Sequence, residues 1–291
     1  MQKINYWIKA SRPQTLIASL APVCTASILC YKKYDHFSIV IFLLKAISAV
    51  LIQIMTNFIN DLYDYKKGAD NNRVGPDRMI QKGYLSENEL VKAIYFILLI
   101  SLLIGIYLAT IGGIIIIAIG LSSFLLAYLY TATRFSIAYN GLGEIFVFIY
   151  FGLIASLGTC YLQILEYNNN VLLIGIIYGS LNVCLLIINN LRDIDSDKSS
   201  HKYTLIARYG KFFGYFEFSF FIILAYLGLY YFAISVNNEL LFYSALSLII
   251  IPVFILFLST KHNNFLNKRA LPSMSIYITL FTVLLTFIII K

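Results

Sequence analysis

Long apolar runs alternate with short polar segments along the whole chain. Nine such runs are visible, at about residues 14–31, 39–60, 90–109, 111–131, 141–163, 171–190, 213–235, 240–259 and 272–290. A helix needs about 20 mostly apolar residues to cross a bilayer, and inside lipid every backbone polar group needs a partner within the structure. The pattern therefore predicts an all-α integral membrane protein, with nine transmembrane helices forming a single domain over residues 1–291.

The charges sort by side of the predicted membrane. Only 12% of the residues are charged against 60% hydrophobic, yet the net charge is +8. Of the 22 lysines and arginines, the side opposite the N-terminus has only Lys32, Lys33 and Lys291, and Lys45 falls early in the second run. Positive residues favour the cytoplasmic side, so we expect a cytoplasmic N-terminus. A basic cytoplasmic face suits anionic lipid and anionic substrate, and since no nucleic-acid motif is visible we expect no nucleic-acid partner.

The four cysteines carry no pattern of their own. Cys24, Cys30, Cys160 and Cys184 lie inside apolar runs, without a CxxC pair or a histidine at ligand spacing. We therefore expect them to be small core residues.

The densest polar stretch, residues 57–83, reads NFINDLYDYKKGADNNRVGPDRMIQKG and begins where the second run ends. Asn57, Asn60, Asp61 and Asp64 follow at helical spacing, so they share one helix face if the helix continues. Carboxylates placed in this way repel each other, and a cation between them turns the repulsion into binding. The plain alternative is a solvated helix end.

The loop that follows, from Lys66 to Leu85, is long for a membrane hairpin, and such loops are usually functional or disordered. Lys67, Arg73 and Arg78 are candidates to contact diphosphate oxygens, because arginine grips them as a bidentate fork and lysine as a point charge. The alternative is that each only serves the positive-inside bias.

A second, shorter polar motif, NNLRDIDSDKSSHK, occupies residues 189–202 at the end of the sixth run. Asn189, Asp193 and Asp197 stand four residues apart, with Arg192 among them and Lys198 and Lys202 beyond. The spacing from Asn189 to Asp193 equals that from Asn60 to Asp64, and four spans separate the two motifs. They therefore have the same orientation, as in internal repeats that build a site between membrane halves.

A third polar segment lies where the fifth run begins. Tyr130, Arg134, Tyr139 and Glu144 cluster there. Glu144 is suited to cap the N-terminus of the helix that begins here, where the helix dipole is positive. It equally suits a role in orienting the hydroxyl group of an aromatic substrate.

Two facing carboxylate clusters suit a diphosphate bridged by Mg²⁺, which is typically held by one or two carboxylates plus phosphate oxygens. A neutralised diphosphate is a good leaving group, so an allylic diphosphate ionises toward a carbocation that attacks an electron-rich ring. We therefore predict magnesium-dependent prenyl transfer at a cytoplasmic-side site.

These motifs closely resemble a known family. RPQTLIASLAPV, NDLYDYKKGADNNRVGPDR, GLGEIFVFIYFGLIASLGTCYLQ and NNLRDIDSDKSSHKYTLIARYG are similar to segments of the UbiA superfamily of intramembrane prenyltransferases. Within it they look most like the 1,4-dihydroxy-2-naphthoate polyprenyltransferases of menaquinone synthesis. One departure is Ala132-Thr133-Arg134, where that family usually has Gly-Gly-Pro.

The resemblance implies a UbiA-type helix bundle in the bacterial cytoplasmic (inner) membrane, with Mg²⁺ as cofactor. Its implied reaction transfers a polyprenyl group from polyprenyl diphosphate to 1,4-dihydroxy-2-naphthoate, with loss of carbon dioxide, giving demethylmenaquinone. The predicted catalytic residues are Asp64, Lys67, Arg192 and Asp193; the metal ligands Asp61, Asp64, Asp70, Asp193 and Asp197; and the substrate-binding residues Asn57, Asn60, Arg73, Arg78, Tyr130, Arg134, Tyr139, Glu144, Asn189, Lys198 and Lys202.

The same sequence features are also compatible with other functions. Within the enzyme class, the acceptor is alternatively 4-hydroxybenzoate or another aromatic acid, or the donor carries a phytyl group. A cation-coupled transporter also has acidic residues in helices. Transporters place such charges near the bilayer midplane on broken helices, whereas nearly all charges of this chain fall at cytoplasmic ends of runs.

Overall fold

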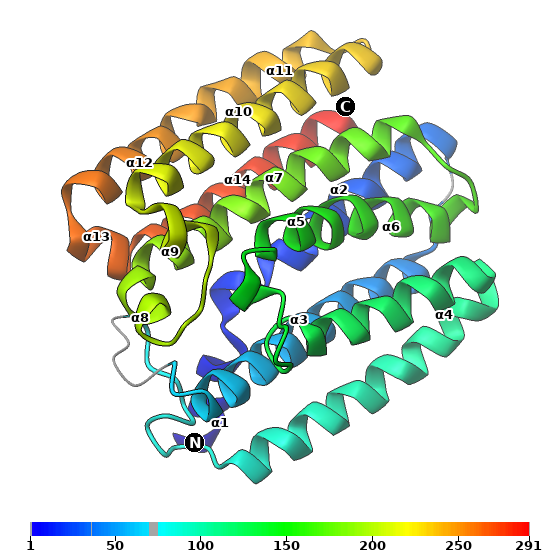
Figure 1. Ribbon diagram of the computed structural model, residues 1–291. Coiled ribbons are helices and arrows are strands. Elements are labelled where there is room, and N and C mark those ends of the chain that lie inside the picture. The colour runs from blue at the N-terminus through cyan, green and yellow to red at the C-terminus, as the bar shows by residue number, and fades with distance from the viewer. Residues whose placement is uncertain (1, 36, 70–74, 291) are drawn as a thin grey trace.

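The computed structural model describes residues 2–35, 37–69 and 75–290, and its regular elements are helices (Figure 1). Seven helical segments are long and apolar enough to cross a membrane, or eight if one bent pair counts as a single span. The seven are α3 (Ile39–Lys66), α4 (Glu87–Leu129), Gly143–Ile164, α7 (Asn169–Arg192), α10 (Lys211–Ser235), Glu239–Lys261 and α14 (Ala270–Ile290). The expectation of an all-helical, multi-pass membrane protein is confirmed.

The N-terminal apolar run does not form a straight helix. α1 (Gln2–Ser11) and a 3-10 turn (Pro13–Thr15) precede α2 (Ile17–Tyr34), and the chain bends by 55° between them. Arg12 adopts a left-handed conformation (φ 53°) just before the turn. Such a backbone is uncommon for a residue other than glycine and is often found at functional sites.

Two apolar runs expected as separate helices, 90–109 and 111–131, form the single 43-residue element α4. Gly113 interrupts its helical backbone (φ 61°, ψ −149°), a conformation that glycine adopts at little cost. Figure 1 shows the chain of α4 turning back on itself. The two halves of α4 thus form a tight hairpin without a separate loop.

Two other spans are composite. The span Gly143–Ile164 contains α5 (Gly143–Phe148), a π-helical turn (Ile149–Ile154) and α6 (Ala155–Ile164). The span Glu239–Lys261 contains α11 (Glu239–Leu246), a 3-10 turn (Ser247–Ile249) and α12 (Ile250–Lys261). The short helices α8 (Ile194–Ser199), α9 (Leu205–Tyr209) and α13 (Asn263–Lys268) lie between the longer ones, and a 3-10 turn (Ala138–Asn140) precedes α5.

α7 is the central helix of the bundle. Most of its side chains are buried, and it packs against α2, α5, α10, α14 and the π-helical turn. A Cβ atom on Gly152 would lie only 2.4 Å from Gly179 Cα, and one on Gly179 only 2.7 Å from the Phe148 carbonyl oxygen. Small residues of this kind let membrane helices approach closely. Gly175 and Gly179, four residues apart, make this contact possible.

Asn182 of α7 ties three helical segments together. Pro22 lies inside α2 and has no N–H to donate to the carbonyl four residues earlier, that of Ala18. The Asn182 amide donates to that Ala18 oxygen at 2.9 Å and to the Phe151 oxygen of the π-helical turn at 2.8 Å. In a membrane such freed carbonyls must be satisfied by neighbouring groups, and one amide here satisfies two.

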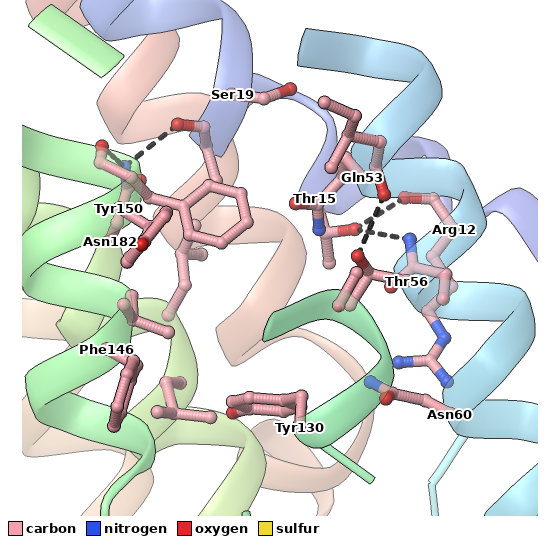
Figure 2. Close-up of a pocket in the computed structure, with 18 of the residues that line it drawn as sticks. Arg12, Thr15, Ser19, Gln53, Thr56, Asn60, Tyr130, Phe146, Tyr150 and Asn182 are labelled. Atoms are coloured by element: carbon pink, nitrogen blue, oxygen red, sulfur yellow. Dashed lines mark hydrogen bonds between the residues drawn. The ribbon is translucent and has the colours of Figure 1, made fainter. Parts of the chain in front are cut away.

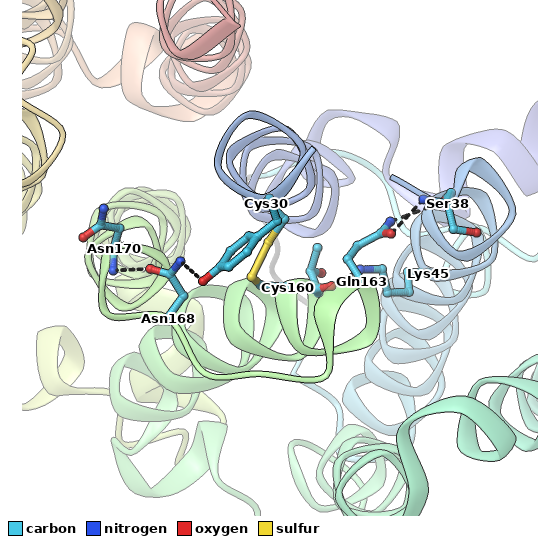
Figure 3. Close-up of a disulfide and its surroundings, with 9 residues drawn as sticks. Cys30, Ser38, Lys45, Cys160, Gln163, Asn168 and Asn170 are labelled. Atoms are coloured by element: carbon cyan, nitrogen blue, oxygen red, sulfur yellow. Dashed lines mark hydrogen bonds between the residues drawn. A yellow bond between two sulfur atoms is a disulfide. The ribbon is translucent and has the colours of Figure 1, made fainter. Parts of the chain in front are cut away.

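A disulfide corrects the expectation that all four cysteines are simple core residues. Cys30 near the end of α2 is bonded to Cys160 of α6, with their Cα atoms 6.0 Å apart (Figure 3). Cys24 and Cys184 are free thiols. The two bonded cysteines are 130 residues apart in sequence, so no cysteine spacing motif predicts this disulfide. Both cysteines lie in apolar runs, and the packing of α2 on α6 brings them together.

Polar contacts surround the disulfide. The Ser38 N–H donates to Gln163 Oε1 at 2.9 Å, and Gln163 Nε2 donates back to the Ser38 oxygen at 3.2 Å. Lys45 Nζ donates to the carbonyl oxygen of Thr159, next to Cys160 (Figure 3). These contacts fasten the beginning of α3 to the end of α6.

Candidate active site

A cavity of about 680 Å³ opens between α3 and α7 and is also lined by α2, α4 and the segment from α5 to α6. The ends of both polar motifs line it, including Asn60, Asp64 and Asp193. Lys45 lines it too, 19 residues before Asp64 on the same helix, which corresponds to about 28 Å of helix. The cavity is therefore deep as well as polar at the end where the motifs lie.

The deeper walls of the cavity are mainly apolar. Ile52 of α3, Leu108 and Ile119 of α4, Phe151 of the π-helical turn and Leu162 of α6 all contribute to them. Figure 2 shows Phe146, Tyr150 and Asn182 on one wall and Gln53, Thr56 and Asn60 on the other. A hydrocarbon chain fits such walls, since its burial removes apolar surface from water.

Asp61 is held by two arginines. Its side chain is 2% exposed, accepts from Arg12, and lies 3.0 Å from Arg78 Nη1. Its predicted role as a metal ligand stays a prediction, but the structure gives it a clear second role as the carboxylate that positions both guanidinium groups. Arg12 was not among the expected site residues. Its position immediately before Pro13 and the first apolar run was the available signal.

Asp64 and two ammonium groups surround the side chain of Tyr139. The Tyr139 hydroxyl donates to Asp64 Oδ1 at 2.9 Å. Lys67 Nζ donates to the Thr131 oxygen at 2.6 Å and lies 4.1 Å from the centre of the Tyr139 ring. Lys202 Nζ lies 5.7 Å from the same ring centre. Tyr139 therefore joins residues of the first motif to the last lysine of the second.

The asparagines of the first motif connect helix ends. Asn57 Nδ2 donates to the Ser11 oxygen at 2.9 Å, and Asn60 Oδ1 accepts from the Thr131 hydroxyl. Asn57 and Asn60 both line the cavity, as does Asn189 of the second motif.

The second motif presents two buried carboxylates. Arg192 donates to both oxygens of Asp193 at 2.8 Å, and Lys202 Nζ lies 3.5 Å from Asp197 Oδ1. Asp197 Oδ2 is buried and has no hydrogen-bond partner among the described residues. An orphaned carboxylate oxygen at this place fits a cationic ligand.

The two motifs share one electrostatic environment. Burial raises the pKa of Asp197 to about 6; the Lys202 charge opposes this rise, and the charges of Asp193 and Asp64 add to it. Carboxylates from α3 and from the α7–α8 junction therefore repel each other across the site. In residues 2–35, 37–69 and 75–290, no three acidic, histidine or cysteine side chains converge closely enough to hold a metal ion by themselves.

The donor set nevertheless fits magnesium, which takes hard oxygen ligands and commonly uses one or two carboxylates together with substrate phosphates. The carboxylates of Asp64, Asp193 and Asp197 are oxygen donors of this kind, and Asp64 and Asp193 line the cavity. Asp70 and Arg73, also predicted for the site, lie outside the described residues.

Other predicted residues divide into two groups. Tyr130 and Glu144 line the cavity, and Asn190 Nδ2 donates to Glu144 Oε1 at 3.0 Å. Arg134 and Lys198 are exposed and do not line the cavity. Their roles in substrate binding stay predictions. Gln53 and Asn182, which line the cavity at greater depth, were not predicted, because single polar residues inside apolar runs carried no motif.

The sequence comparisons agree with this geometry. Residues 19–287 match the UbiA prenyltransferase family. The chain is 35% identical over 221 residues to a 1,4-dihydroxy-2-naphthoate octaprenyltransferase of Haemophilus influenzae, covering 73% of this chain and 72% of that protein. It is 34% identical to the Escherichia coli enzyme of the same name, covering 72% and 70%. A Dictyostelium discoideum UbiA prenyltransferase domain-containing protein 1 is 27% identical, covering 92% and 81%.

Solved structures share the fold at low sequence identity. A UbiA homolog from Archaeoglobus fulgidus bound to GPP and Mg²⁺ superposes with a TM-score of 0.70 at 15% identity, covering 98% of this chain and 99% of that one. A digeranylgeranylglyceryl phosphate synthase gives a TM-score of 0.60 at 17% identity, covering 100% and 98%. The match of residues 19–287 to the family and the octaprenyltransferase relatives at 34–35% identity show that the chain belongs to the UbiA prenyltransferase family and is a prenyltransferase enzyme.

Proposed function

We propose that this enzyme transfers a polyprenyl group from polyprenyl diphosphate to 1,4-dihydroxy-2-naphthoate, with loss of diphosphate and carbon dioxide. The observation that carries the proposal is the meeting of two Asn/Asp motifs at one end of a deep, mainly apolar cavity. The relatives named as 1,4-dihydroxy-2-naphthoate octaprenyltransferases, at 34–35% identity, support this choice of acceptor.

The donor diphosphate binds at the motif end of the cavity. Arg12, Arg78, Arg192 and Lys202 line the cavity there and supply the positive charge. The buried Nε of Arg12 has no hydrogen-bond partner in the described part of the chain, so it retains a donor for an anion. The prenyl tail extends along the apolar walls formed by α4 and the π-helical turn.

Asp64, Asp193 and Asp197, with Asp70 and Asp61 as further predicted ligands, would hold Mg²⁺. When bound there, it would supply positive charge that makes the diphosphate a better leaving group. The protein's own cations act in the same direction, because charge develops on the leaving oxygen as the bond to prenyl C1 lengthens. Lys67 supports the site by holding the loop around Thr131 and Thr133 through their carbonyl oxygens.

The acceptor ring attacks as the donor ionises. The bond between prenyl C1 and the diphosphate oxygen breaks, and its electron pair leaves with diphosphate. A new bond joins prenyl C1 to the ring carbon that bears the carboxylate. Loss of carbon dioxide from that carbon returns an electron pair to the ring, giving demethylmenaquinone first in its hydroquinone form. Tyr130 and Glu144 line the cavity, and in this proposal their side chains contact the acceptor.

The same proposal includes the membrane arrangement. When the two halves of α4 count separately, and α2 counts as a span beside the seven long segments, nine spans result. With nine spans, the basic loops and both motifs lie on the cytoplasmic side of a bacterial inner membrane. The Cys30–Cys160 disulfide, at the opposite end of α2 and α6, then faces the oxidising side, where disulfides persist.

The test is a product mass spectrum from the purified protein with octaprenyl diphosphate and Mg²⁺. Parallel reactions contain 1,4-dihydroxy-2-naphthoate or 4-hydroxybenzoate, and each is repeated with EDTA. We expect a product only from the naphthoate, lighter than the simple adduct by carbon dioxide and absent with EDTA. Product only from the benzoate overturns the acceptor, and product that persists with EDTA overturns the metal dependence.

A further inference from the structure

Two amide oxygens that face the cavity at similar depth have no hydrogen-bond partner among the described residues. The Oε1 atom of Gln53 on α3 and the Oδ1 atom of Asn182 on α7 are both buried without a hydrogen-bond partner among residues 2–35, 37–69 and 75–290. The two residues are only 8% and 2% exposed. Figure 2 shows them on opposite walls of the cavity.

The orientation of the Asn182 amide is fixed by its contacts. Its nitrogen donates to two carbonyl oxygens, those of Ala18 and Phe151. A carbonyl oxygen only accepts, so the atom facing these two groups must be the NH₂. The Asn182 oxygen is therefore the free atom, and it presents a hydrogen-bond acceptor that the protein itself does not use.

The Gln53 side chain makes no hydrogen bond that stabilises the fold. No described residue donates to or accepts from its side chain. Its neighbour Thr56, one turn further along α3, instead donates to the Ile52 oxygen of its own helix at 2.8 Å. A buried amide without partners destabilises the folded protein unless a ligand or water satisfies it.

The two amides occupy equivalent positions in the internal repeat. Gln53 lies seven residues before Asn60, and Asn182 lies seven residues before Asn189. Seven residues correspond to about 10 Å of helix, so both amides lie about two turns deeper than the motifs. A bicyclic aromatic acid bound between these amides is therefore long enough to reach the site where the diphosphate leaves.

We infer that Gln53 and Asn182 form a hydrogen-bonding site for the acceptor, in which its ring hydroxyl farthest from the carboxylate donates to the Asn182 oxygen and accepts from the Gln53 amide, whose orientation no protein contact fixes. A pure hydrocarbon tail would leave both amide oxygens unsatisfied, whereas a phenolic hydroxyl donates to such an oxygen. The carboxylate end of the acceptor then points toward the arginine-rich end of the cavity. This site selects a ring with two hydroxyl groups, and this inference rests on the proposed function.

The test compares 1,4-dihydroxy-2-naphthoate with 1-hydroxy-2-naphthoate, which lacks the distal hydroxyl group. For each protein variant, kcat/KM is measured for both acceptors at saturating octaprenyl diphosphate and Mg²⁺, and the ratio is taken. Intrinsic reactivity differs between the two rings but is common to all variants, so it cancels when ratios are compared. Gln53→Leu removes the amide without removing a protein hydrogen bond.

We expect Gln53→Leu to reduce the preference for the dihydroxy acceptor by about tenfold or more, because a paired hydroxyl group becomes unpaired in an apolar site. The KM for octaprenyl diphosphate stays unchanged. Thr56→Val is the matched control: it also removes a polar group from the same wall, but one already satisfied within its helix, and it leaves the ratio as in the wild type.

An unchanged ratio in Gln53→Leu overturns the proposed acceptor-binding role of the two amides. A change confined to the KM of the prenyl donor also overturns it, because the amides would then contact the prenyl chain. Failure of the proposed function appears separately, as absence of product from the naphthoate with wild-type protein. If the wild-type protein uses 4-hydroxybenzoate instead, the same role is tested by the KM of Gln53→Leu for that acceptor. An unchanged KM overturns the role, and a raised KM supports it for an acceptor with a single hydroxyl group.

Discussion

The Tyr139 hydroxyl donates a hydrogen bond of 2.9 Å to Asp64, and Lys67 lies 4.1 Å from the centre of the same ring. A tyrosine expected to contact substrate therefore also fixes a carboxylate of the first motif. With one lone pair engaged by Tyr139, Asp64 is held in a defined rotamer, and pre-oriented ligands bind metal and substrate better than mobile ones.

Tyr139→Phe should weaken the reaction without abolishing it. The change removes one hydrogen bond to a charged group, worth about 1.5–3 kcal/mol, but keeps the ring beside Lys67. We expect kcat to fall by about ten- to a hundredfold and the Mg²⁺ concentration for half-maximal activity to rise. Steady-state kinetics over a magnesium series measures both. If Tyr139 acts only through Asp64, adding Tyr139→Phe to Asp64→Asn costs nothing further; a full additional loss contradicts this coupling.

Asp64→Asn and Asp193→Asn should each reduce prenyl transfer by more than about a hundredfold, because each removes a charged oxygen ligand while keeping the side-chain shape. Product formation under saturating donor and acceptor measures the loss. Asp195→Asn is the matched control, since Asp195 belongs to the same motif but is exposed. Comparable thermal unfolding in detergent shows that the proteins remain folded. Wild-type activity in either site variant contradicts the metal-site assignment.

The sequence predicted those features of the fold and site that have a local signal. Apolar runs of span length mark the helices, and Asn60, Asp64, Asn189 and Asp193 were visible because equal spacing recurred at the ends of two runs. Both motifs do line one cavity. Lipid imposes this regularity, since a spanning segment must satisfy its own backbone.

The remaining features depend on contacts between distant segments. The Cys30–Cys160 bond joins residues 130 positions apart. The position of Arg12 before Pro13 is visible in the sequence, but its contact with the buried Asp61 depends on the fold. Asn182 reads as a single polar residue in an apolar run, although it satisfies the carbonyl that Pro22 leaves without a partner. Such partners are fixed by tertiary packing and not by periodicity.

The disulfide predicts a simple labelling pattern. In protein purified without reductant and then denatured, a maleimide reagent should modify only Cys24 and Cys184; after reduction it should modify all four cysteines. Mass spectrometry counts the additions. Four additions without reduction contradict the bond. The reduced protein should also unfold at lower temperature, because a cross-link closing a long loop typically contributes about 2–4 kcal/mol.

α7 lies so close to α5 that a side chain larger than glycine at their contact should destabilise the protein. Gly179→Ala adds a Cβ atom 2.7 Å from the Phe148 carbonyl oxygen, and because that contact is with backbone, helices must move apart. We expect a loss of about 1–3 kcal/mol in stability, seen as a lower unfolding temperature in detergent. Gly105→Ala is the control, since nothing lies within 4 Å of its added Cβ and alanine favours the helix. Because α7 carries Asn182 and the beginning of the second motif, Gly179→Ala should lower activity in parallel with stability, whereas Gly105→Ala should leave the unfolding temperature equal or higher. Equal stability of the two variants would show that the helices separate here without cost.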